Sequence, residues 1–199
     1  MTLQPLMLRR PPRPRESGYP AQLIEHGLLA DGRALLIRPI KAQDEPLERV
    51  FLQGLSEHTR YMRLLSPRKL LPGELHRHTH IDYRHEMALV ALLGAPGSRH
   101  MVGVARYVLD TDGQGCEFAI VIADELQGQG LGQRLLASLM SAAQNAGLLR
   151  MHGITLATNT GMLGLARRLG FQSEAEPGDA TVLRLQLELA QRRDGWFEL

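Results

Sequence analysis

A short glycine-rich segment between an apolar run and a helical run most strongly limits the folds open to this chain. Residues 127–132 read Gln-Gly-Gln-Gly-Leu-Gly, after the apolar run 118–123 and before a run of helical periodicity over 131–146. The first amides of a helix have no partner within the helix and lie at the positive end of its dipole. Glycines let a ligand approach such amides closely. The segment therefore predicts a strand, a turn and a helix whose N-terminus binds a phosphate-bearing cofactor.

The spacing of these glycines excludes two common nucleotide-binding motifs. The dinucleotide fingerprint requires a third glycine where this chain has Gln133. The phosphate loop of nucleotide hydrolases requires a lysine after its second glycine, and the only lysines here are Lys41 and Lys69. No acidic residue occurs between Leu126 and Ser173, although four arginines do, and this bias favours an anionic ligand. A glycine-rich turn without any ligand is the alternative.

Three features of this half resemble the acetyl-CoA site of the GNAT acetyltransferase superfamily. They are the pattern Gln-x-x-Gly-x-Gly over 127–132, the pattern Asn-x-x-Met-x-x-Leu over 159–165, and Leu-Gly-Phe at 169–171. The resemblance extends over about residues 33 to 190. Segments 55–63, 81–91 and 116–119 resemble more narrowly the catalytic domain of bacterial protein lysine acetyltransferases that act on acyl-CoA synthetases.

This resemblance implies an α/β (α+β) class, the GNAT fold, with a mixed, mostly antiparallel central sheet and helices on both faces. In that fold two parallel strands splay apart, and the pantetheine arm of acetyl-CoA lies between them. The resemblance implies cofactor contacts at Ile120, Ile122, Gln127, Gly128, Gln129, Gly130, Leu131, Gly132, Gln133 and Asn159. Asn159 fits the N-cap of a helix equally well, because asparagine is favoured there.

Periodicity and turn residues predict the elements independently of the resemblance. Asp31 and Gly32 predict a hairpin between 23–29 and 34–40. Three helices follow, over 45–55 with Asp44 as its cap, from Ser56, and from Pro72. The remaining predicted elements are strands at 87–93, 101–109 and 117–123, a helix at 131–146, a parallel strand at 154–157, a helix at 161–169 and a last strand at 181–189.

Acetyl transfer to an amine requires a base, because a free lysine has a pKa near 10.4. Glu117 opens the strand before the glycine turn and matches the glutamate of the resembled lysine acetyltransferases, so we expect it to be that base. Its apolar neighbours predict a desolvated carboxyl group. Many GNAT members carry a tyrosine as general acid seven residues after the asparagine, where this chain has Ala166. The sequence therefore does not identify the group that protonates the thiolate.

Composition bounds the organisation of the chain and its partners. The 199 residues carry 44% hydrophobic residues and a net charge of +2. Residues 1–20 hold five prolines and four arginines, which predicts a flexible basic arm before a single domain over 21–199. With that arm removed, little basic charge remains for nucleic acid, and no apolar run is long enough to cross a membrane. The lone Cys116 fits a reducing compartment, so we expect a cytoplasmic protein.

Other residues invite catalytic or metal roles, and none of these roles is predicted. Cys116 has no activating neighbour in sequence and is expected to be a packing residue. Histidines 76, 78, 80 and 85 are crowded, but their spacing matches no known ligand set, so no metal is predicted. Residues that could orient a peptide or simply pack are Tyr61, Arg63, Asp82 and Tyr83.

The sequence predicts an N-acetyltransferase that uses acetyl-CoA as co-substrate and a protein lysine as acceptor, by direct attack in a ternary complex. An acyl-CoA synthetase is the partner that the resemblance implies. Two alternatives stay open, which are a small-molecule amine acetyltransferase and a non-enzymatic acyl-CoA sensor. The oligomeric state, the acyl-chain preference and any regulator are left undetermined.

Overall fold

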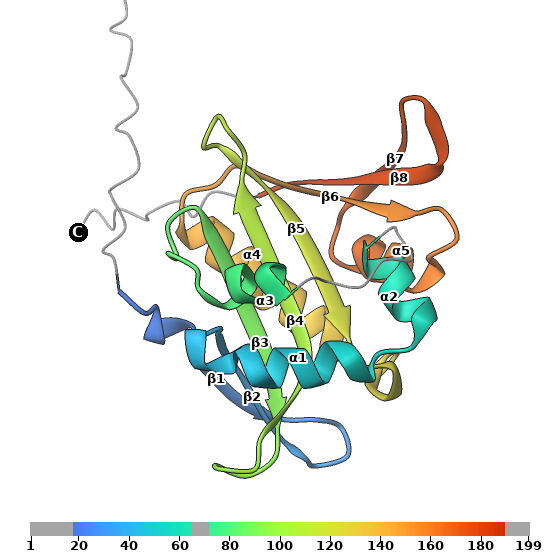
Figure 1. The fold of residues 1–199 in the computed structure, drawn as a ribbon. Helices are drawn as coiled ribbons and strands as arrows, with labels where there is room; N and C mark the ends of the chain where they lie inside the picture. Colours follow the sequence, from blue (N-terminus) through green and yellow to red (C-terminus); the bar gives the residue numbers. More distant parts are fainter. Residues whose placement is uncertain (1–17, 65–71, 190–199) are drawn as a thin grey trace, which may run out of the picture.

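A single eight-stranded sheet organises the protein (Figure 1). The computed structural model describes residues 18–64 and 72–189. The strands stand in the order β1-β2-β3-β4-β5-β6-β8-β7. Their bounds are β1 Glu25–Leu28, β2 Ala34–Pro39, β3 Glu86–Leu93, β4 His100–Leu109, β5 Gly115–Ile122, β6 Arg150–Leu156, β7 Gln172–Glu176 and β8 Asp179–Glu188.

The sheet is mixed, as the sequence predicted. Neighbouring strands pair antiparallel except β5 and β6, which are parallel and joined by a helical crossover. The helices are α1 Glu45–Gly54, α2 Glu57–Leu64, α3 Pro72–Thr79, α4 Leu131–Asn145 and α5 Thr160–Arg168. Helices α1 and α3 lie in front of the sheet in Figure 1, and α4 lies behind it, so both faces are covered.

Helix α4 supplies the largest apolar contact with the sheet. The predicted stripe of Leu131, Leu135, Leu139 and Ala143 is at most 2% exposed. These side chains pack with buried residues of β3, β4 and β5 in one hydrophobic core. Because leucines at helical spacing present one apolar face, the sequence predicted this packing correctly.

Strand boundaries near the C-terminal end differ from the prediction. Strand β6 begins at Arg150, four residues before the predicted start, and the last strand occupies 179–188. Strand β7 was not predicted, because Gln-Ser-Glu-Ala-Glu has no alternation of apolar and polar residues. Four of its five residues are exposed, and pairing with β8 through the turn at Gly178, where φ is 89°, holds it in the sheet.

Asp44 precedes α1 as expected, but its side chain makes no capping bond to the helix. Instead its carboxylate accepts hydrogen bonds from the Lys41 amide at 2.7 Å and from the Arg38 guanidinium at 2.7 Å. A bidentate pair with arginine is stronger than a bond to one helix amide. Asp44 therefore ties the end of β2 to the start of α1.

The N-terminal arm and the C-terminal ten residues lie largely outside the described residues. Of the predicted arm 1–20, only residues 18–20 are described, and there Tyr19 already contacts the domain. Its hydroxyl donates to the carbonyl of Pro39 at 3.1 Å, and its ring meets Tyr83 edge to face at 5.9 Å. No helix in ranges 18–64 and 72–189 has the length and apolarity to span a bilayer.

Candidate active site

The parallel strands β5 and β6 separate after three residue pairs. The ladder runs from Gly115 opposite Arg150 to Glu117 opposite His152. Strand β5 then continues to Ile122 without pairing with β6. A β-carbon at Gly153 would come within 3.0 Å of the Phe118 carbonyl oxygen, so the strands are still close just past the last pair. Beyond this point a gap opens between them.

A cavity of about 510 Å³ occupies this gap and extends over the start of α4. Its wall is built from β5, β6, the glycine turn and helices α2 to α5. Eight of the ten predicted cofactor contacts lie in the wall, namely Ile120, Ile122, Gln127, Gly128, Gly130, Gly132, Gln133 and Asn159. The structure thus brings together residues that are up to 39 positions apart in the chain.

The backbone of β5 presents alternate residues to the gap. The amide of Ala123 donates to the carbonyl of Val102 at 2.9 Å, so odd-numbered residues direct their amides and carbonyls toward β4. Even-numbered residues must then direct theirs toward the gap, and these include Ile120 and Ile122. The Ile122 carbonyl accepts a bond from the Gln127 side chain at 3.1 Å.

The glycine turn between β5 and α4 requires backbone angles that other residues avoid. Gly128 has φ 74° and Gly130, at the N-cap of α4, has φ 85°. An L-residue adopts this left-handed region at a cost of roughly 1 to 2 kcal/mol. No side chain caps the first turn of α4, so its amides are available to an anion.

Side chains from α2 hold the turn in place. The Asp124 carboxylate accepts hydrogen bonds from the Ser56 amide at 2.9 Å, the Ser56 hydroxyl at 2.7 Å and the Thr59 hydroxyl at 2.6 Å. The Gln127 side chain donates to the Thr59 hydroxyl at 3.2 Å. Gln129 and Leu131 lie outside the cavity wall, since Gln129 donates to the Glu125 carbonyl and Leu131 is buried. Any contact from these two to a cofactor would come from their backbone.

Glu117 stands where the gap begins, on the face of β5 that α2 contacts. Its side chain is exposed, so the desolvation expected from the apolar neighbours Phe118 and Ala119 is wrong. Side chains alternate along a strand, and Phe118 points to the opposite face, where its ring lies 5.0 Å from that of Phe171. Adjacent residues in a strand therefore give no shielding to Glu117.

A second, open groove of about 630 Å³ meets the cavity at Glu117. It runs along the face of β6 and β8, where Arg150, His152 and Ile154 stand opposite Glu188, Gln186 and Arg184. Its five acidic residues, against two arginines, are Asp110, Glu117, Glu176, Asp179 and Glu188. The groove therefore carries a negative charge that favours a cationic group.

A buried cluster of charged side chains lies between α1 and β4. Arg106 of β4 donates to Glu48 of α1 at 2.9 Å, with Glu48 1% and Arg106 9% exposed. Burial raises the pKa of Glu48 and lowers the pKa of Arg106. Burial and the charge of Arg106 also lower the pKa of Arg63 to about 10 and the pKa of His78 to about 3. His78 is therefore neutral in the cavity wall at physiological pH.

Asn159 serves as the N-cap of α5 and also lines the cavity. Its side-chain oxygen accepts a hydrogen bond from the Met162 amide at 3.0 Å. The N-cap interpretation is therefore confirmed, and the cofactor contact stays a prediction for a residue that lines the cavity. Ala166, at the position where many GNAT members have a tyrosine, is 2% exposed and offers no acid.

The remaining candidates divide clearly between structural and cavity positions. Cys116 is fully buried in the core, as expected of a packing residue. Asp82 accepts bonds from the Arg84 and His85 amides, and the Tyr83 hydroxyl donates to the Ile40 carbonyl at 2.6 Å. Tyr61 is exposed, and of this group Arg63 alone lines the cavity.

Several wall residues were not predicted to contact a cofactor or an acceptor. They include His58, Met62, Glu74, His78, Leu165 and Arg168. Leu165 belonged to a recognised pattern, Arg168 to the arginines that favoured an anion, and His78 to the crowded histidines. Their positions around the gap depend on how the helices pack over it, which no local pattern predicts.

Splayed parallel strands, with a helix N-terminus at one end of the gap and a carboxylate at the other, define an acyltransferase. Residues 57–171 match the Acetyltransferase (GNAT) family, and the chain belongs to that family. The Pseudomonas aeruginosa protein named Acetyltransferase PA5475 is 36% identical over 178 residues, which are 88% of this chain and 96% of that protein.

Two solved structures share the fold. The GNAT domain of S. lividans PAT has a TM-score of 0.77 at 25% identity, and the match covers 86% of this chain and all of that domain. The Salmonella typhimurium protein yncA, solved with its cofactor acetyl-CoA, has a TM-score of 0.63 at 19% identity, covering 80% of this chain and 96% of that one.

Proposed function

We propose that this protein transfers an acetyl group from acetyl-CoA to the side-chain amine of a protein lysine. The observation that carries the proposal is the position of Glu117, which borders both the cavity between β5 and β6 and the acidic groove. A donor in the cavity and an acceptor in the groove would meet at this carboxylate. Direct transfer in a ternary complex requires such a meeting point.

The donor would lie along the cavity with its pyrophosphate at the glycine turn. Amides at the start of α4 supply hydrogen bonds and the positive end of a helix dipole. The pantetheine arm would hydrogen-bond the edge of β5 at Ile120 and Ile122, whose backbone groups face the gap. In this pose the thioester would lie near Glu117, at the narrow end of the gap.

The acceptor would be cationic until it reaches the thioester. The groove carries more carboxylates than guanidinium groups, and a protonated lysine complements that charge. Glu117 would take the ammonium proton, directly or through a water molecule, and the neutral amine would attack the thioester carbonyl. An amide of β5 directed into the gap, such as that of Ile120, would stabilise the oxyanion. The C–N bond forms, the C–S bond breaks, the nitrogen releases its second proton to water, and CoA leaves as the thiolate.

A lysine of an acyl-CoA synthetase is our favoured target. The support is the resemblance of segments 55–63, 81–91 and 116–119 to lysine acetyltransferases of that specificity, together with the fold shared with S. lividans PAT. The absence of a tyrosine at Ala166 agrees with this subfamily better than with many small-amine acetyltransferases.

The experiment is incubation of the purified chain with radiolabelled acetyl-CoA and a cell extract, followed by location of the label. Label on one synthetase lysine supports the proposal in full. Label confined to small amines would replace it with the small-molecule alternative. Binding of acetyl-CoA with no transfer to any acceptor, unchanged in the Glu117→Gln variant, would favour the sensor.

A further inference from the structure

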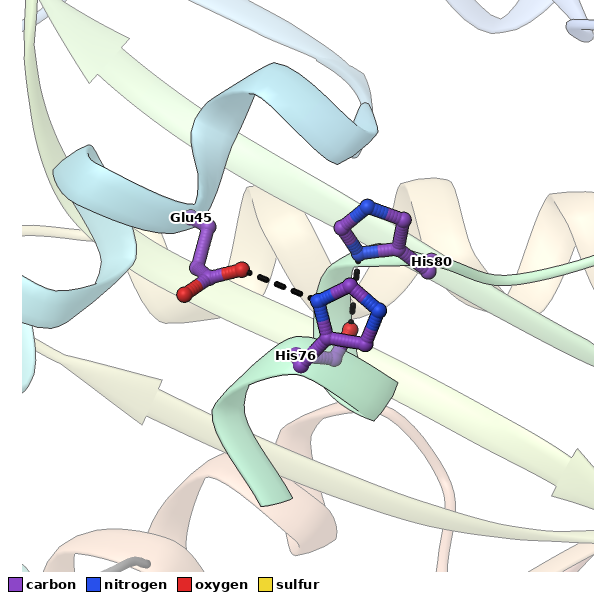
Figure 2. A group of neighbouring side chains, drawn as sticks. All are labelled: Glu45, His76 and His80. Atoms are coloured by element: carbon purple, nitrogen blue, oxygen red, sulfur yellow. Dashed lines mark hydrogen bonds and ion pairs between the residues drawn. The ribbon is translucent and has the colours of Figure 1, made fainter. Parts of the chain in front are cut away.

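Two histidines and a glutamate from different helices gather on the outer surface of the α1 and α3 layer (Figure 2). One donor atom from each of Glu45, His76 and His80 lies within 4.8 Å of the donor atoms of the other two. We propose that these three residues bind a divalent transition-metal ion, and that this ion is zinc. This proposal is independent of the acetyltransferase reaction.

The distance between two of the donors already suits a shared ion. Nδ1 of His76 lies 3.2 Å from Oε2 of Glu45. Zinc bonds to histidine nitrogen and carboxylate oxygen are about 2.0 to 2.2 Å long, so donors at tetrahedral angles stand about 3.4 Å apart. His80 would have to turn out of its stacked position on the His76 ring to complete a set of three, and water would supply the fourth ligand.

Neighbouring groups orient all three side chains. The other carboxylate oxygen of Glu45 accepts a hydrogen bond from Arg49 at 2.7 Å, which leaves Oε2 directed at His76. The His80 ring stacks on the His76 ring with centroids 3.7 Å apart, and its Nδ1 lies 3.0 Å from the His76 carbonyl oxygen. Hydrogen bonds of this kind hold metal-binding histidines in position.

The chemistry of the three donor groups also indicates a class of ion. Two imidazoles with one carboxylate suit zinc and its transition-metal neighbours, whereas calcium and magnesium prefer oxygen ligands alone.

The pairing of α1 with α3 explains why the histidine spacing alone predicted no metal. His76 lies in α3 and His80 directly follows its last residue, so the two stand one helical turn apart, but two ligands do not make a specific site. Glu45 lies 31 residues before His76, and only the packing of the two helices brings it into reach.

A bound ion would tie α3 to α1. Helix α3 also carries Glu74 and His78, which line the cavity on the side away from the glycine turn. Metal binding would therefore fix one wall of that cavity and stabilise the fold by an amount that rises with the logarithm of metal concentration above the dissociation constant.

The test uses the full chain without an added histidine tag. Zinc chloride is titrated by calorimetry into the wild type and into the variants His76→Ala, His80→Ala and His85→Ala. His85 is a matched control, because it is an exposed histidine paired with the Asp82 carboxylate at 2.7 Å. Among the described residues, this pair has no third potential ligand in reach. The unfolding midpoint is measured with and without zinc.

We expect one zinc ion per wild-type chain and a rise in the unfolding midpoint. His76→Ala and His80→Ala should each weaken binding more than about 100-fold, since loss of even an outer-shell partner costs roughly 10- to 100-fold. His85→Ala should bind as the wild type does. Absence of stoichiometric binding, or equal losses in all three variants, would overturn the proposal.

Discussion

Glu117 and His152 form the last residue pair of the parallel ladder between β5 and β6. From this pair onward the two strands diverge, and the cavity and the acidic groove meet beside it. The carboxylate therefore borders both the cavity between the strands and the groove on the sheet face.

Replacement of Glu117 by Gln should reduce acetyl transfer to a lysine-containing acceptor by about 100-fold or more, because a positioned base contributes roughly that much. Binding of acetyl-CoA should change less than twofold, since the amide keeps the size of the side chain. The measurements are initial rates across pH and calorimetric acetyl-CoA affinity, with the exposed Glu174→Gln as control. A rate within a few-fold of wild type at every pH would refute the assigned role.

Replacement of Gly130 by Ala should weaken acetyl-CoA binding and lower the free energy of unfolding by about 1 to 2 kcal/mol, because φ is 85°. Gly178→Ala is the matched control, since its φ is 89° and neither position has an atom within 4 Å of an added β-carbon. Both variants should lose similar stability in denaturant unfolding, and only Gly130→Ala should lose cofactor affinity. Equal affinities for acetyl-CoA would contradict a cofactor site at this turn.

Asp124 connects α2 to the glycine turn, so Asp124→Ala should destabilise the protein by about 1 to 2 kcal/mol and raise the dissociation constant for acetyl-CoA. Asp179→Ala removes a similar pair of bonds, from the Thr181 amide and hydroxyl, in the distant β7–β8 turn. That control should leave affinity unchanged. Although burial raises the pKa of Asp124, hydrogen bonds from Thr59 and Ser56 lower it overall. Its stabilising effect should therefore disappear as the pH falls below about 4.

His78 should make the fold sensitive to acid. Burial, with the charges of Arg106 and Arg63, lowers its pKa to about 3, whereas an unfolded chain has a histidine pKa near 6.5. Between these values the unfolded state binds a proton that the native state does not, so stability falls as the pH decreases. Relative to His78→Gln, the wild type should lose up to about 1.4 kcal/mol per pH unit below pH 6.

Denaturant unfolding at several pH values between 7 and 4 measures this difference. The exposed His100→Gln should follow the wild type over the same range. If His78→Gln also follows the wild type, His78 is protonated in the native state and the prediction fails.

The buried pair between Arg106 and Glu48 predicts strong coupling. Arg106→Met alone leaves the Glu48 carboxylate buried without its partner and should cost about 3 to 5 kcal/mol. Adding Glu48→Leu removes the stranded charge and should recover much of that loss. A double-mutant cycle in denaturant gives the coupling energy, and additive effects would contradict a direct pair.

Local features of the chain were predictable because they depend on backbone conformation and periodicity. The left-handed glycines of the turn, the buried leucine stripe of α4 and the Asn159 cap follow from rules that operate within a few residues. The resemblance then identified ten candidate cofactor contacts, and eight of these residues line one cavity.

Non-local features were not predictable in the same way. The apolar neighbours of Glu117 suggested a desolvated carboxyl group, yet alternation along β5 turns Phe118 to the opposite face, and the small Ala119 on the same face leaves Glu117 exposed. Strand β7 has no apolar pattern, and its pairing with β8 alone makes it a strand. No sequence pattern predicted that His78 lies in the cavity wall, because this position depends on how α3 packs over the sheet.

The sequence by itself determined the glycine turn, the family and the order of every element except β7, since each depends on short-range patterns. The tertiary structure decided that Glu117 borders both the cavity and the acidic groove. It also decided that Glu45 stands beside His76 and His80. These relationships join residues tens of positions apart, and only the packing of helices and strands into one core fixes such distances.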